Sequence, residues 1–181
     1  MIDLPMVPFF TKLPDIAAVE TRELIIVNNK NIPTGAYGLI ESYCDELNCD
    51  CRRVFINVVL EDSPSEILAT ISYGWETPKF YKKWMRLASP ELLEMMTHPH
   101  LEIGHRQSKY ANDFLDLFKA VIKDESYVER LARHYFLFKE VVNRENTGVK
   151  GIKIGRNELC PCGSGKKEKP QMIYSLMYKI V

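Results

Sequence analysis

The segment Ile67-Leu68-Ala69-Thr70-Ile71-Ser72-Tyr73-Gly74-Trp75 has the clearest two-residue alternation in the chain. Its odd-numbered residues are all apolar or aromatic, which predicts a β-strand that buries one face. Three further strand-like segments precede it, at residues 24–27, 37–43 and 53–60. Because short, turn-prone stretches separate these segments, the sequence predicts an antiparallel β-meander of about four strands.

Helical patterns follow the strands. Thr77-Pro78 and Ser89-Pro90 each place an N-cap residue before a proline, which suits the first turn of a helix. Apolar residues at helical spacing predict a further helix over 111–122, and Ser126-Tyr127-Val128-Glu129 is typical of a capping box that opens the last one. Its buried side is expected to include Leu131, Tyr135, Phe138 and Val142. We therefore predict an α+β fold with three to four helices packed on one face of the sheet.

The ends of the chain have a different composition from its middle. Residues 1–18 contain three prolines and are expected to form an extended arm. Residues 147–181 are rich in glycine and basic side chains at first, which predicts a linker and a short tail after an α+β domain over 1–146.

Charge and hydropathy exclude some functional classes. The 181 residues carry 24 Lys or Arg and 24 Asp or Glu, so no overall field attracts nucleic acid or anionic lipid. No signal peptide is recognisable, and no apolar run reaches the roughly 18 residues of a membrane span. We expect a cytoplasmic protein without a membrane partner, and clustered cysteines in that compartment indicate metal binding in preference to disulfides.

Three of the five cysteines fall between the second and third predicted strands, at Cys44, Cys49 and Cys51. A hairpin brings its two ends together, so these thiols can converge on one metal ion, and zinc is the metal that such a set favours. Structural zinc needs a fourth ligand. The sequence does not decide which group supplies this fourth ligand. His134 is one candidate, because it lies on the apolar side of its helix. The others are His98, His100, His105, Asp45, a water molecule and a tail cysteine.

Two other interpretations of these thiols stay open. Three protein ligands and a water would form an open site, as in a metal-dependent hydrolase. The thiols could equally be ordinary buried cysteines, because cysteine is among the most buried residue types.

A second cysteine pair lies in the tail, in Gly155-Arg156-Asn157-Glu158-Leu159-Cys160-Pro161-Cys162-Gly163-Ser164-Gly165-Lys166-Lys167. This stretch resembles the SEC-C motif, a small zinc-binding module found at the end of the preprotein-translocation motor ATPase and on many other bacterial proteins. The resemblance implies that Cys160 and Cys162 are the first two zinc ligands. Gln171 and Met172 stand where the family has its other two ligands, and neither is a normal zinc ligand. The motif is therefore degenerate, and we expect Cys160 and Cys162 to be vestigial or auxiliary ligands.

The sequence thus favours a zinc-binding, non-catalytic module that interacts with a protein partner. A nucleic-acid-binding module is the first alternative, because Lys79, Lys82, Lys83 and Arg86 alternate with aromatic residues on one predicted helix. At helical spacing the same basic residues also suit a solvated helix face.

Overall fold

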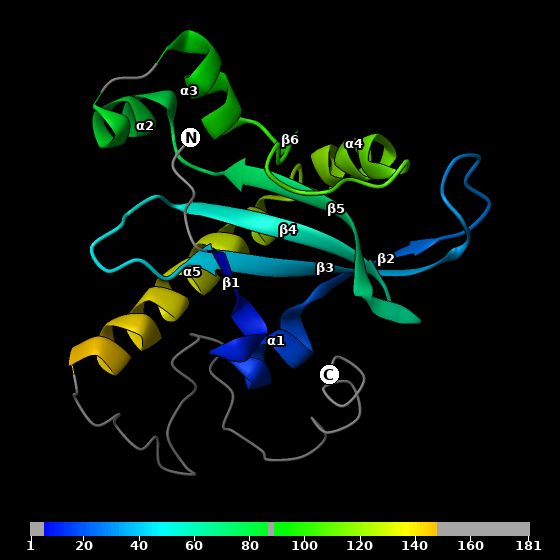
Figure 1. Cartoon of the computed structure of the whole chain (residues 1–181), viewed down its shortest axis with the longest axis horizontal. Helices are drawn as coiled ribbons and strands as arrows, with labels where there is room; N and C mark the ends of the chain where they lie inside the picture. Colours follow the sequence, from blue (N-terminus) through cyan, green and yellow to red (C-terminus); the bar gives the residue numbers. More distant parts are fainter. Residues whose placement is uncertain (1–5, 87–88, 148–181) are drawn as a thin grey trace.

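The fold is α+β, as the sequence predicts (Figure 1). A computed structural model describes residues 6–86 and 89–147 of the chain. Its elements, in chain order, are β1 (Met6–Pro8), the 3-10 helix η1 (Phe9–Thr11), α1 (Pro14–Glu20), β2 (Arg22–Ile26), β3 (Gly35–Cys44), β4 (Arg53–Leu60), β5 (Ser63–Gly74), α2 (Pro78–Met85), α3 (Pro90–Thr97), β6 (His100–Leu101), α4 (Ala111–Val121) and α5 (Glu125–Thr147).

The sheet is antiparallel, and the four predicted strands form its body as β2, β3, β4 and β5. Strand β3 pairs with β4 along one side, and β2 and β1 share its other side. The short strands β1 and β6 complete a six-stranded sheet. Neither was predicted from the sequence, because two or three residues are too few to show an alternation.

The core lies between one face of this sheet and two helices. Along β5, Ala69, Ile71 and Tyr73 are buried as the alternation predicts, and the register places them beside β4. Ile67, on the same predicted face, is 45% exposed, and Thr70 and Ser72 on the opposite face are buried as well. Aromatic rings from α4 and α5 pack on the same face, as the contacts of Phe114 with Tyr37, of Phe118 with Tyr73 and of Phe138 with Tyr43 show. The four residues predicted for the buried side of α5 are all buried.

The N-terminal segment is not the extended arm that its prolines suggest. Pro14 occupies the first turn of α1, where the absence of its N–H costs nothing. Before it, Phe9 is buried and stacks on the imidazole of His134, with ring centroids 4.4 Å apart. The expectation of an extended arm is therefore wrong for the described part of this segment.

The helix starts follow the predicted capping chemistry at two positions out of three. The side chains of Thr77 and Ser89 each accept a backbone N–H in the first turn of α2 and α3. For α5, Asp124 Oδ1 accepts the N–H of Ser126, so the helix begins at Glu125, one residue earlier than the predicted capping box. Across residues 6–86 and 89–147, no helix has both the length and the apolar character that a membrane crossing demands.

Candidate metal centre

The loop between β3 and β4, residues 45–52, has a tight backbone path. Asn48 and Arg52 both adopt positive φ, of 64° and 46°. Asparagine tolerates this conformation well, whereas a bulky arginine adopts it only where its surroundings hold it. Arg52 is held by ion pairs to Asp50 (2.9 Å) and Glu76 (2.8 Å), and its carbonyl accepts a hydrogen bond from the Tyr81 hydroxyl. These contacts of Arg52 fix the position at which the loop ends and β4 begins.

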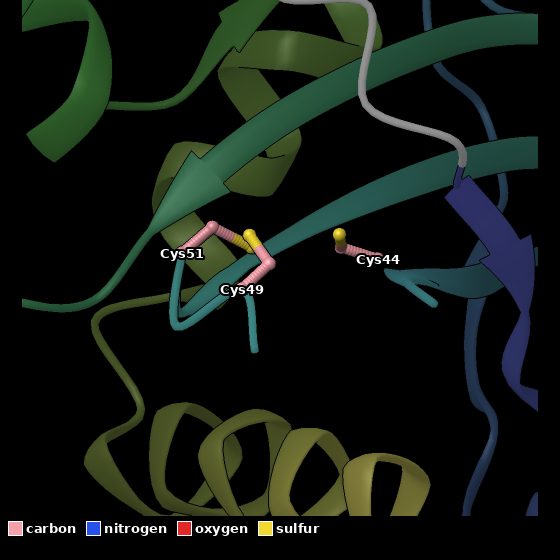
Figure 2. Close-up of side chains that lie close together, drawn as sticks. All are labelled: Cys44, Cys49 and Cys51. Carbon is pink, nitrogen blue, oxygen red and sulfur yellow. The ribbon is translucent and has the colours of Figure 1, made fainter. Parts of the chain in front are cut away.

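This path brings the three predicted thiols together (Figure 2). Cys44 ends β3, and Cys49 and Cys51 lie on the returning side of the loop. The sulfur atoms of Cys44, Cys49 and Cys51 all lie within 4.8 Å of one another, and the three cysteines are free thiols. Cys44 and Cys51 are fully buried, while Cys49 is partly exposed. Three soft sulfur donors in one place form a group that can hold a metal ion.

Hydrogen bonds among the thiols shift their acidity in opposite directions. Contact with the Cys51 thiol lowers the pKa of Cys49 to about 6 and also lowers the pKa of Cys44. Contact with the other two sulfurs, together with burial, raises the pKa of Cys51 itself. Since only the thiolate binds a metal, the cluster already favours the reactive form at Cys49 near neutral pH.

Helix α5 supplies two groups that the sequence reasoning missed. The ammonium of Lys139, only 9% exposed, donates to the backbone carbonyls of Cys44 (3.4 Å) and Glu46 (2.6 Å). Its charge also helps to lower the pKa of Cys49. The hydroxyl of Tyr135 donates to the Cys49 carbonyl (3.2 Å), so α5 contacts both sides of the loop.

The special role of Lys139 could have been predicted from its position in the sequence. It lies four residues after Tyr135 and beside Phe138, on the buried side of α5, where a lysine needs a specific reason to be present.

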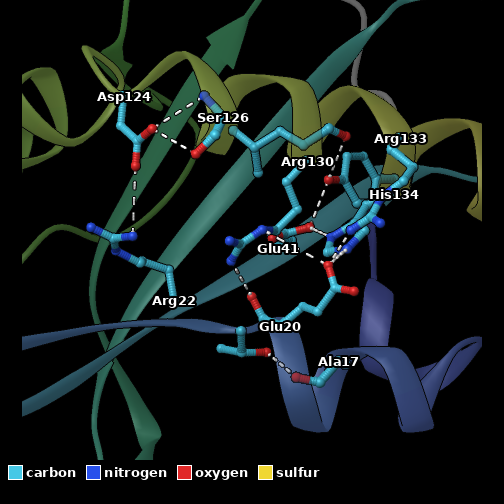
Figure 3. Close-up of polar contacts among 12 residues, drawn as sticks. Ala17, Glu20, Arg22, Glu41, Asp124, Ser126, Arg130, Arg133 and His134 are labelled. Atoms are coloured by element: carbon cyan, nitrogen blue, oxygen red, sulfur yellow. Dashed lines mark hydrogen bonds and ion pairs between the residues drawn. The ribbon is translucent and has the colours of Figure 1, made fainter. Parts of the chain in front are cut away.

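His134 does not join the thiols. It is 1% exposed, and its Nδ1 lies 2.7 Å from Glu41 Oε2 while its Nε2 lies 3.1 Å from Glu20 Oε2. Figure 3 shows Glu20 from α1 and Glu41 from β3 converging on this imidazole. Tyr43 also donates to Glu41 Oε2, and Arg133 pairs with Glu20. Both ring nitrogens are therefore engaged with carboxylates, in a buried polar cluster that ties α1 and β3 to α5.

The other candidate ligands are dispersed. Asp45 follows Cys44 in the loop and is half-buried. His98 and His100 line a pocket of about 320 Å³ together with Glu91, Glu94, Met95 and Pro99, and none of the three thiols lines it. His105 is exposed, with its ring edge-on to Phe55. Cys160 and Cys162 lie outside the described residues.

The predicted basic residues lie on the surface of α2 and at its end. Lys79, Lys82, Lys83 and Arg86 are all exposed, whereas Tyr81 on the same helix is buried. Within the described residues, no ion pair joins any of these four to an acidic side chain.

Comparison with known proteins identifies one segment of the chain. The family model of the SEC-C motif matches residues 156–167, which is the stretch that carries Cys160 and Cys162. No curated protein and no solved structure matches the chain. The match covers nearly all of the stretch in which the resemblance was seen and leaves Gln171 and Met172 outside it.

Proposed function

We propose that this chain is a zinc-binding interaction module in which Cys44, Cys49 and Cys51 hold a structural ion. The convergence of the three sulfur atoms within 4.8 Å is the observation that supports it. Zinc–sulfur bonds of about 2.3 Å in tetrahedral geometry need sulfur atoms about 3.8 Å apart. Closing the group around an ion therefore requires shifts of about 1 Å or less in a loop that already has the correct path.

Charge balance supports the same assignment. The three loop thiolates and one divalent cation carry a net charge of −1, and a fourth thiolate brings it to −2, so a buried site needs positive charge nearby. Lys139 supplies one positive charge beside the thiols, and within the described residues it forms no ion pair with a carboxylate. A thiolate–metal centre would explain why a lysine is buried at this position.

The ion would fasten β3, β4 and α5 to one another. Cys44 ends β3, Cys51 lies two residues before β4, and Tyr135 and Lys139 hold the loop backbone from α5. The fourth ligand in this proposal is a thiol of the tail. The residues between Thr147 and Cys160 reach up to about 40 Å when extended, which is ample for Cys160 or Cys162 to approach the loop.

Zinc content tests this function directly. Protein purified without added metal is expected to contain about one zinc per chain, and Cys49→Ser to contain much less, because only two of the three loop thiols then remain to hold the ion. Cys160→Ser is the matched control, since the tail still offers Cys162, and it should keep most of its zinc. Wild-type zinc content in Cys49→Ser would contradict the proposal.

A further inference from the structure

Arg52, at the end of the loop between β3 and β4, contacts two aromatic rings. The guanidinium of Arg52 lies 4.6 Å from the centroid of Phe80 on α2 and 5.6 Å from that of Phe136 on α5. Asp50 and Glu76 fix the same guanidinium from the sides. The ring of Phe136 is 49% exposed, although α5 buries other aromatic side chains in the core. An exposed, rigidly held aromatic ring is typical of the anchor of a binding surface.

A basic surface borders these rings. At 3.6 residues per turn, Lys79, Lys82 and Lys83 fall within an arc of about 100° on α2, away from the buried Tyr81. Arg86 follows at the end of the helix and is also exposed. Phe80 follows Lys79 in the chain, and its ring contacts Arg52. The basic residues of α2 therefore border the site where Arg52 contacts the two rings.

We propose that this surface, formed by Phe80, Phe136 and the basic residues of α2, binds an acidic polypeptide segment that carries an aromatic or apolar side chain. The inference names the partner class of the proposed interaction module and so rests on that function. Carboxylates of the partner pair with Lys79, Lys82 and Lys83, which have no acidic partner in the described chain, and its apolar side chain packs on Phe136.

Charge decides between an acidic polypeptide and a nucleic acid. The chain has a formal net charge of zero, and the basic side chains of this surface are confined to Lys79, Lys82, Lys83 and Arg86. A polyphosphate carries a charge at every nucleotide and needs a wide basic surface, so this arrangement suits it poorly. A peptide needs only a few carboxylates opposite the lysines and one apolar contact at the rings.

The test uses three defined probes and the zinc-loaded full-length chain. A random copolymer of glutamate and tyrosine supplies both carboxylates and aromatic anchors, polyglutamate supplies carboxylates alone, and an oligo-deoxythymidine supplies phosphates and bases. Binding is measured by fluorescence anisotropy at a salt concentration of about 150 mM, where weak surface attraction is screened. The copolymer is expected to bind most tightly, and the oligonucleotide most weakly.

Two sets of variants connect binding to this surface. Lys82→Glu with Lys83→Glu is expected to weaken copolymer binding about tenfold or more, while Lys30→Glu with Lys123→Glu, the charge-matched control on exposed residues elsewhere, changes it by less than about twofold. Phe136→Ala should weaken copolymer binding about fivefold and leave polyglutamate binding unchanged.

Three results would overturn the inference. These are no copolymer binding, equal effects of the two lysine pairs, or tighter binding of the oligonucleotide than of the copolymer. Zinc content is measured for every variant, so a failure of this surface is distinguishable from a failure of the metal site.

Discussion

Replacing His134 with alanine is expected to lower the free energy of unfolding by about 3–5 kcal/mol. The imidazole lies between Glu41 and Glu20, and Glu41 is only 5% exposed. Without the ring, Glu41 keeps a hydrogen bond from Tyr43 but loses the contact between its Oε2 and His134 Nδ1, so a buried carboxylate is left with one polar partner fewer. The stacking of Phe9 on the ring is lost as well. Urea denaturation of the two proteins measures the difference.

Two further variants separate this effect from the loss of any histidine. His105→Ala removes an exposed imidazole and is expected to cost less than about 1 kcal/mol. The double variant Glu41→Met with His134→Leu removes both polar groups and fills their volume, so it should recover most of the stability lost by His134→Ala. A loss below about 1 kcal/mol in His134→Ala would show that the cluster does not join α1 and β3 to α5 in the way described.

Replacing Gly74 with alanine is expected to cost about 3 kcal/mol or more. Gly74 ends β5 where α2 and α3 meet the sheet, and a Cβ at this position would come closer than 3.0 Å to the Tyr81 hydroxyl and to the Met96 backbone carbonyl. Neither group has room to move, because Tyr81 is fully buried and its hydroxyl donates to the Arg52 carbonyl. The expected readout is a lower urea midpoint with an unchanged dependence of stability on urea concentration.

Gly104→Ala is the matched control for Gly74→Ala. It makes the same chemical change at a glycine where an added Cβ meets nothing within 4 Å, so the stability should change by less than about 0.5 kcal/mol. If the two alanine variants were equally stable, the packing of Tyr81 and α3 against the end of β5 would be contradicted.

Local patterns in the sequence predicted the elements that depend on local chemistry. The alternation through Ile71 and Tyr73 identified β5, and the caps Thr77 and Ser89 placed the starts of α2 and α3. The meeting of Cys44 with Cys49 and Cys51 also follows from local structure, because a hairpin loop closes on itself. Each of these features depends on residues that lie within about ten positions of one another in the sequence.

Features that depend on distant residues could not be predicted in this way. His134 has its two partners 93 and 114 residues away, and nothing in its helical pattern distinguishes a metal ligand from a partner of carboxylates. Strand β6 forms only because His100 and Leu101 pair with β5. Helix α1 was not predicted, because it lies in a segment whose prolines suggest an extended chain. Tertiary packing decides all three.

Zinc K-edge absorption tests the central claim most directly. The sample is the variant Cys160→Ser with Cys162→Ser, reconstituted with one equivalent of zinc, so that only the loop thiols remain. The account predicts three sulfur neighbours at about 2.3 Å and one lighter ligand. A shell of nitrogen and oxygen atoms alone would show that Cys44, Cys49 and Cys51 do not hold the metal.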